Sequence, residues 1–436
     1  MEWWLVLLII FSFLIVVMLS GLPIAFCFML LNIIGVYIFW GGEVGLSQLI
    51  LSVFTSLGRF TLMPVPMFVL LGEVMFHSGM GLNMIDVLDK WLGRLPGRLG
   101  LLAVASATMF STMSGSTMAT TAMLGTLLTP EMEKRGYKKP MSIGPIMGSG
   151  GLAMLIPPSG LAVLLAAVAE ISIGRLLIAG IIPGLVIAFF YASYVIFRCW
   201  LQPSIAPSYE VPSTSLAEKL IATVKYVLPL GSIVFVVLGF IFLGIATPTQ
   251  AAALGAVSCL VLATFYGKLN WDLVKKSVTG TVQVTAMTFM IIGGAVAFSQ
   301  VLGFSGATKG LLGFVVGLPL APIILFIAMQ AILLILGMFM SAVAIMMISI
   351  PIYMPIIYAL GFDPIWFGLI MLINMEMAMT TPPFGMLLFV MRGVAPKGTT
   401  MVDIYLAGIP FLLCDLSTML LIIAFPIVAL WLPGMM

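Results

Sequence analysis

The chain has 436 residues, of which 62% are apolar and only 8% are charged, whereas a soluble domain carries about 25% charged residues. This composition excludes a water-soluble globular fold. The net charge of +3 is small, and the 18 lysines and arginines lie in short clusters between apolar runs, which argues against a nucleic-acid surface.

The apolar segments predict an all-α polytopic membrane protein, because a helix needs roughly 20 apolar residues to cross a bilayer core. In chain order they span about 3–20, 22–40, 60–80, 99–130, 141–170, 175–198, 222–245, 247–265, 279–302, 318–358, 365–391 and 404–432. No basic region precedes the first segment, so we expect a retained helix with Trp3 and Trp4 in the interfacial aromatic belt. Polar connectors at 81–98 and 267–276 are expected to form interfacial helices.

Three of these segments, 99–130, 141–170 and 318–358, are too long for one simple crossing. Gly, Pro or Ser clusters interrupt each of them. We therefore predict two re-entrant helical hairpins, at 99–130 and 318–358, and two broken helices, at 141–170 and 365–391.

Landmarks recur along the chain at a nearly constant spacing, which indicates an internal repeat. The recurring pairs are Pro23 with Pro248, Ser114 with Ser341, Pro140 with Pro364, and Pro157 with Pro382, at offsets of 225, 227, 224 and 225. Four landmarks in one order at nearly one offset predict two copies of one structural repeat.

The basic residues predict how the two copies face. With both hairpins re-entrant, the loops at 81–98, 131–140, 198–225, 266–276 and 392–403 share one side and hold 15 Lys or Arg, while the other side holds Arg59, Arg175 and Lys309. The positive-inside rule makes the rich side cytoplasmic and the N-terminus periplasmic. The two copies are then related by inverted topology, an architecture that holds substrate near the bilayer midplane in secondary transporters.

The predicted organisation has two halves. The first, 1–198, contains scaffold helices within 1–80, the connector 81–98, the hairpin 99–130, the broken helix 141–170 and a helix at 175–198. A proline-containing cytoplasmic linker follows at 199–217. The second half, 218–436, contains scaffold helices within 222–302, the hairpin 318–358, the broken helix 365–391 and a last helix at 404–432.

Polar residues concentrate at the predicted breaks. Residues 110–121 carry seven hydroxyls and a glycine, although a lipid-facing helix needs none of them. A hairpin tip leaves backbone groups without intrahelical partners, so carbonyls and hydroxyls there suit a dehydrated sodium ion, while the N-terminus of the next helix suits an anion. Close helix packing through small residues is the alternative.

The broken helices support the same interpretation. In the first, the glycine-rich run 148–151 precedes Pro157 and Pro158, whose rings prevent normal helix; a simple proline kink is the alternative. In the second, Asn374 and Glu376 precede Pro382 and Pro383, and Glu376 is expected either to couple to a cation or to contact backbone N–H groups. For Glu73 and Asp415, structural roles are favoured.

Other chemistries find little support in the sequence. The single histidine, His77, excludes a histidine-rich metal site, and Cys27, Cys199, Cys259 and Cys414 lack paired spacing. No Walker A motif is present, so energy must come from an ion gradient or another subunit. An intramembrane enzyme would need a nucleophile with a base or a metal cluster, and a channel would normally show repeated pore-lining filters.

Five runs together resemble the large membrane subunit (DctM-like permease) of tripartite ATP-independent periplasmic (TRAP) transporters. They are 114–120 (SGSTMAT), 156–159 (IPPS), 178–184 (IAGIIPG), 246–255 (ATPTQAAALG) and 380–385 (TTPPFG). They occur in the family's order, and the similarity covers nearly the whole chain.

The resemblance implies sodium-coupled secondary uptake of a small organic anion (a carboxylate, sugar acid or sulfonate) by an elevator mechanism across the bacterial inner membrane. In such a mechanism, a transport domain holding both hairpins and both broken helices slides against a scaffold. It also implies two partners: a small four-helix membrane subunit and a periplasmic substrate-binding protein.

The resemblance assigns sites to the tips of the hairpins and the breaks beside them. The implied substrate residues are Ser114, Gly115, Ser116, Thr117, Pro158, Ser159, Ser341, Ala342 and Pro383. The implied sodium residues are Ser114, Ser116, Gly148, Ser149, Pro157, Gly337, Met340, Ser341, Asn374, Glu376, Thr380 and Thr381.

One departure from the family stands at the second tip, where many relatives have an Asp-Pro-Thr sequence and this chain has Ser341 and Ala342 after Met340. The missing acid leaves the second cation site and the identity of the anion open. A stand-alone sodium:dicarboxylate symporter that needs no binding protein is the main alternative function.

Overall fold

The computed structural model describes residues 2–93, 95–207 and 215–436, with only the backbone at 82 and 112–114. Within these ranges the chain forms helices joined by short connections, with no strand. Seven helical segments are long and apolar enough to cross a membrane. The predicted all-α polytopic architecture is therefore confirmed.

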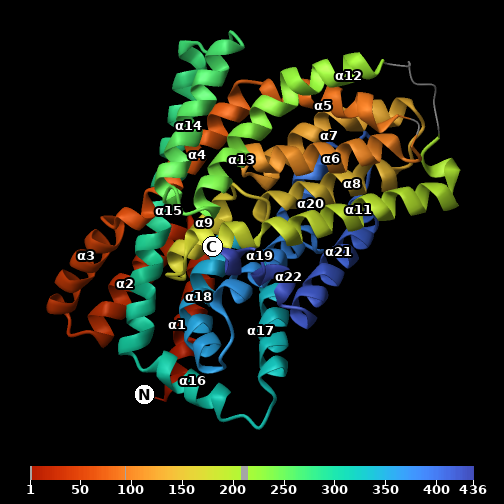
Figure 1. Cartoon of the computed structure of the whole chain (residues 1–436). Helices are drawn as coiled ribbons and strands as arrows, with labels where there is room; N and C mark the ends of the chain where they lie inside the picture. Colours follow the sequence, from red (N-terminus) through yellow and green to blue (C-terminus); the bar gives the residue numbers. More distant parts are fainter. Residues whose placement is uncertain (1, 94, 208–214) are drawn as a thin grey trace.

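The helices fall into two packed groups (Figure 1). The first group joins the N-terminal helices to helices from the middle of the chain, and α4 packs closely against α14 and α15. Its helices are α1 (Trp3–Leu19), α2 (Ile24–Phe39), α3 (Glu43–Leu57), α4 (Pro64–His77), α13 (Leu228–Phe242), α14 (Pro248–Phe265), α15 (Trp271–Phe304) and α16 (Ala307–Val316). We refer to these eight helices as the scaffold group.

The second group, which we refer to as the core group, gathers the hairpins and broken helices. Its helices are α6 (Arg98–Ser114), α7 (Thr117–Lys134), α8 (Lys139–Gly150), α9 (Gly160–Val168), α10 (Ile173–Ala179), α11 (Ile181–Leu201), α17 (Pro322–Gly337), α18 (Ala342–Ala359), α19 (Pro364–Thr380), α20 (Met386–Val394), α21 (Met401–Ala424) and α22 (Ile427–Leu430). Helix α21 packs on α8, α11 and α19, so elements from both halves of the sequence form one body. Helices α5 (Met80–Leu92) and α12 (Leu216–Ala222) pack on each other beside these groups.

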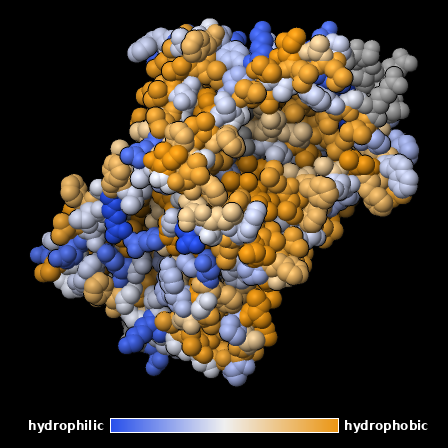
Figure 2. Space-filling view, in the orientation of Figure 1, coloured by the Kyte–Doolittle hydropathy of each residue, from blue (hydrophilic) through white to orange (hydrophobic). Residues whose placement is uncertain are grey.

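Apolar side chains cover much of the molecular surface (Figure 2). Leu19, Phe235 and Phe265 are 82%, 78% and 84% exposed. Water would penalise such exposure, whereas hydrocarbon does not. The outward faces of the scaffold group are therefore suited to lipid.

Contacts between loops test the predicted sidedness. Trp91 Nε1 donates to Thr223 Oγ1 over 2.8 Å, and the Lys138 N–H donates to the Ile205 carbonyl over 2.9 Å. The Tyr266 hydroxyl donates to the Lys225 carbonyl. Together with the contact of Lys139 described next, these contacts bring the five basic loops together on one face of the molecule.

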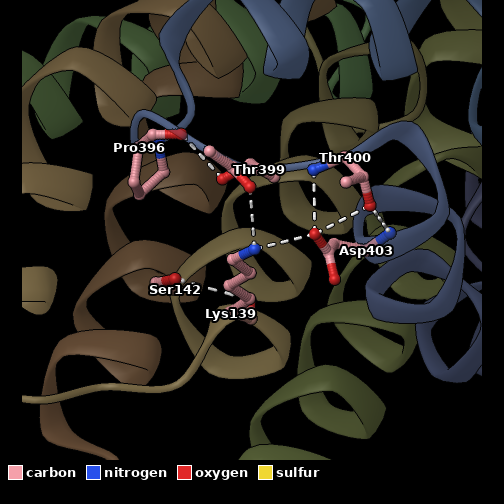
Figure 3. A network of polar contacts seen from close by, with 7 residues as sticks. Lys139, Ser142, Pro396, Thr399, Thr400 and Asp403 are labelled. Atoms are coloured by element: carbon pink, nitrogen blue, oxygen red, sulfur yellow. Dashed lines mark hydrogen bonds and ion pairs between the residues drawn. The ribbon is translucent and has the colours of Figure 1, made fainter.

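Lys139, at the start of α8, joins the two halves of the chain on this face (Figure 3). Its Nζ lies 2.8 Å from Asp403 Oδ2 and 3.2 Å from the Gly398 carbonyl oxygen. Asp403 also accepts from the Thr400 N–H over 2.8 Å, which completes a capping box on α21. The network fixes the beginning of the first broken helix to the beginning of the last long helix.

Three helices differ from the sequence prediction. Helix α3 was missed because its face carries Glu43, Ser47, Gln48, Ser52 and Thr55, so no uninterrupted apolar run exists. Residues 271–276 of the connector expected at 267–276 are instead the first part of α15, a single 34-residue helix that is capped by Asn270 and contains no proline. Helix α16 was also missed. Residues 208–214 of the predicted linker lie outside the described residues.

Candidate functional site

The first hairpin turns over two residues. Helix α6 ends at Ser114, and Gly115 adopts φ 57°, a left-handed conformation that glycine reaches at little cost. Its N–H donates to the Ser111 carbonyl over 3.2 Å. Ser116 then caps α7 by accepting from the Ala119 N–H over 3.4 Å. The first turn of α7 therefore begins directly at the hairpin tip.

The first broken helix passes directly behind this tip. After α8 and one 3₁₀ turn (η2, Gly151–Met154), the chain passes through a turn and a series of bends that include Pro157 and Pro158 before α9 begins at Gly160. Ser159 caps α9 by accepting from the Ala162 N–H over 3.2 Å, and its hydroxyl donates to the Met154 carbonyl over 2.7 Å. A Cβ placed on Gly115 would lie only 3.1 Å from the Pro158 carbonyl oxygen. The hairpin tip therefore rests on the break.

The second hairpin and the second broken helix are arranged in the same way. Helix α17 ends at Gly337, and Ser341 caps α18 by accepting from the Ala344 N–H over 3.3 Å. Helix α19 ends at Thr380, and the Thr381 hydroxyl donates to the Met377 carbonyl over 2.6 Å. A Cβ on Gly337 would lie 2.1 Å from the Cβ of Ala378, so α17 and α19 are in direct backbone-level contact.

Both tips open into one cavity of about 340 Å³ between the two groups of helices. Residues of α4 and α15 form the scaffold side, and the tips form the core side. Six of the nine predicted substrate residues line it: Gly115, Ser116, Thr117, Pro158, Ser341 and Ala342. Tertiary packing has brought residues more than 220 positions apart to the same space.

The other three predicted substrate residues are placed differently. Ser159 is fully buried in its capping role. The carbonyl of Pro383 accepts a 3.0 Å hydrogen bond from the Tyr405 hydroxyl. The side chain of Ser114 lies outside the described residues.

Several predicted sodium residues have backbone or hydroxyl oxygens near the breaks. The Thr380 hydroxyl donates to the Met377 carbonyl over 3.0 Å, and the buried Ser149 hydroxyl donates to the Pro145 carbonyl. Met340, at the second tip, donates its N–H to the Leu336 carbonyl over 3.0 Å. These hydroxyls and N–H groups are engaged as donors, which leaves the hydroxyl lone pairs for a cation.

Gly148 does not face the first hairpin. A Cβ at this position would lie 2.7 Å from the Phe411 ring, so Gly148 instead permits close packing of α8 on α21. The residue that meets the hairpin is Gly150, whose Cβ would lie 1.9 Å from Thr121 Oγ1. Thr121 is fully buried, and its Oγ1 has no hydrogen-bond partner within the described part of the chain. Thr121 belongs to the hydroxyl-rich run at 110–121, but nothing in the sequence distinguishes it from the other hydroxyls of that run.

Asn374 lies two turns before the break rather than beside the tip. Its Nδ2 donates to the Gln330 carbonyl over 2.8 Å and to Gln330 Oε1 over 2.9 Å. This pair joins α19 to α17 in the middle of the second hairpin. This geometry indicates a polar contact that holds two membrane helices together.

Glu376 points away from the second hairpin and toward the first broken helix. A Cβ on Gly151 of η2 would lie 2.6 Å from Glu376 Oε1. Glu376 is 1% exposed, and neither carboxyl oxygen has a hydrogen-bond partner among the described residues. Asp415, equally buried, accepts a hydrogen bond from the Tyr191 hydroxyl. Glu376 is thus held between the two broken helices.

Glu73 on α4 and Thr288 on α15 also line the cavity. Glu73 had been identified as an ionisable residue in a membrane segment, but nothing local indicated that its side chain faces the hairpin tips. The position of Thr288 carried no sequence signal.

Comparison with known proteins places the chain in a family. The model for the DctM component of the tripartite ATP-independent periplasmic transporter matches residues 11–428. The chain is 33% identical to the C4-dicarboxylate TRAP transporter large permease protein DctM of Rhodobacter capsulatus, over 98% of this chain and 99% of that protein. It is 32% identical to the isethionate TRAP transporter permease protein DctMQ of Oleidesulfovibrio alaskensis, over 81% of this chain and 55% of that protein.

Among solved structures, the YdaH transporter of Alcanivorax borkumensis is similar with a TM-score of 0.62, at 15% identity over 90% of each chain. This likeness concerns the fold alone. The sequence relatives are named as permease subunits of transporters and not as enzymes. The chain therefore belongs to the family of DctM components, the large permease subunits of tripartite ATP-independent periplasmic transporters.

Proposed function

We propose that this chain carries out sodium-coupled uptake of a small organic anion across the bacterial inner membrane. Two partners complete the system: a small four-helix membrane subunit and a periplasmic binding protein that delivers the substrate. The observation that supports this proposal most directly is the convergence of both hairpin tips on one cavity between two separately packed groups of helices.

The chemistry of the tips suits an anion beside a cation. The cavity is lined by residues at the starts of α7, α9 and α18, whose exposed N–H groups and dipoles favour negative charge. Carbonyls and hydroxyls at the ends of the preceding helices favour sodium. The two named relatives handle a dicarboxylate and a sulfonate, which supports a small acid as substrate here.

The sodium proposal predicts the outcome of ion replacement. In proteoliposomes containing this chain, its small partner subunit and a substrate-loaded binding protein, an inward sodium gradient should drive uptake. Replacing all sodium with choline at constant pH should reduce uptake to background, because the sites beside the tips would be empty. Unchanged uptake in choline would refute sodium coupling, and uptake without the binding protein would favour the stand-alone symporter.

The two groups of helices fit an elevator mechanism, in which the core group moves against the scaffold group. Arg59, which precedes α4, forms an ion pair with Glu170, which follows α9. The helical segment Phe60–His77 lies between Arg59 and the basic loops, so this pair belongs to the opposite face. We assign that face to the periplasm, together with the N-terminus. An exposed pair of this kind contributes only about 0–1 kcal/mol, so it can open during each cycle.

Cross-linking at this pair tests the movement. In the double variant Arg59→Cys/Glu170→Cys, a bifunctional thiol reagent should reduce uptake to about a tenth or less, because the two groups could no longer separate. Each single variant treated in the same way is the control, since the native cysteines are buried or partly buried. Full uptake by a quantitatively cross-linked double variant would refute relative motion at this contact.

A further inference from the structure

The wall of the cavity opposite the hairpin tips carries a carboxylate. Glu73 lies on α4 of the scaffold group and lines the cavity with its side chain 26% exposed. Gly280 of α15 provides its space, because a Cβ there would lie 2.4 Å from Glu73 Oε2. His77, one turn later on α4, places Nε2 3.1 Å from the same oxygen. The carboxylate is thus positioned by two helices and remains accessible from the cavity.

No lysine or arginine balances this charge among the described residues that line the cavity. The other polar lining side chains are hydroxyls, on Ser116, Thr117, Thr288 and Ser341. Most of the remaining lining is apolar, contributed by residues such as Phe68, Leu164 and Met287. A purely anionic substrate in this space would be repelled by Glu73. The repulsion would be strong, because an apolar cavity screens charges much less than bulk water does.

From this arrangement we infer that the substrate is zwitterionic: its acid group lies at the helix starts of the hairpin tips, and an ammonium group lies toward Glu73. This inference rests on the proposed transport function and specifies the substrate class. The two ends of the cavity have opposite electrostatic preferences, so a small molecule with charges at both ends satisfies each of them. Glu73 is accordingly a specificity-determining residue rather than a structural acid.

Two matched pairs of probes test the inference, because the members of each pair differ only in an amino or a hydroxyl group. They are taurine with isethionate, and β-alanine with 3-hydroxypropionate. The complex of this chain with its small subunit, in lipid nanodiscs with sodium, is titrated with each probe, and the midpoint of thermal unfolding gives the half-saturating concentration. We expect at least one amino compound to bind about tenfold more tightly than its hydroxyl partner, as for a hydrogen bond between charged groups.

Variants distinguish recognition from structure. Glu73→Gln should abolish the preference by weakening the amino compound alone, and Glu43→Gln, which removes an exposed carboxylate outside the cavity, should change nothing. His77→Gln should retain the preference; if it reproduces the effect of Glu73→Gln, the role of Glu73 is to hold His77 and the inference is wrong.

The remaining outcomes also decide the question. The inference of a zwitterionic substrate would be refuted if the unaltered chain bound the hydroxyl acids equally or more tightly. It would also be refuted if neither amino compound bound. A Glu73→Gln variant that shifts only the half-saturating sodium concentration would assign Glu73 to a cation instead. Sodium-dependent binding of a hydroxyl acid alone would leave the proposed transport function standing while refuting this inference.

Discussion

Replacing Glu376 by glutamine is expected to raise the half-saturating sodium concentration for uptake by about 10- to 100-fold, the loss produced by removing one charge-assisted contact. Glu376 is 1% exposed, and its carboxyl group lies against Gly151 and has no hydrogen-bond partner among the described residues. A buried carboxylate without a partner is unfavourable unless a cation or proton accompanies it. The amide has nearly the same shape but cannot neutralise a cation.

The measurement is initial uptake as a function of sodium concentration in proteoliposomes. Glu376→Asp, which keeps the charge, should lose less sodium affinity than Glu376→Gln, and Glu43→Gln should match the unaltered protein. The midpoint temperature of thermal unfolding of the glutamine variant should not fall, because a neutral group replaces a buried charge without a change of volume. A normal sodium dependence in Glu376→Gln would show that the residue serves packing between the broken helices.

Replacing Gly337 by alanine is expected to abolish most uptake. The added Cβ would lie 2.1 Å from the Cβ of Ala378, whereas carbon atoms pack at about 3.5–4.0 Å. Neither atom can rotate away, so the tip of the second hairpin must move by roughly 1.5 Å from the second broken helix. Overpacking of this kind lowers the free energy of unfolding by about 1–3 kcal/mol. It also displaces the backbone oxygens on both sides of the second break.

Two variants make this prediction specific. Gly239→Ala, in α13 where a new Cβ meets nothing within 4 Å, should transport normally and should gain about 0.5–1 kcal/mol of helix stability. The double variant Gly337→Ala/Ala378→Gly exchanges the two side chains across the same contact, so it should recover much of the uptake. Normal transport by Gly337→Ala alone would contradict the close approach of α17 and α19.

The sequence was most informative where a single residue dictates local conformation. The hairpin tip within residues 110–121 was predicted from its cluster of hydroxyls and a glycine, and the interruptions at Pro157–Pro158 and Pro382–Pro383 were predicted from prolines that prevent normal helix. The basic loops were also predicted to share one face, because the charge of a loop does not depend on how the helices pack. In the structure, hydrogen bonds and an ion pair connect these loops to one another.

The orientation of each helix could not be predicted in this way. Glu376 was grouped with the second hairpin but contacts Gly151, and Gly148 was grouped with the first hairpin but contacts Phe411. Helices in a bilayer are apolar on their lipid faces and on their packed faces, so they lack the amphipathic pattern that reveals the buried side of a soluble helix.

The sequence by itself determined the class of protein, the positions of the breaks and the shared face of the basic loops, because composition, glycine, proline and charge act locally. Only the tertiary structure decided which breaks meet, that Asn374 pairs with Gln330, and that Glu73 faces the cavity. These contacts depend on helix rotation, which close packing between distant segments sets.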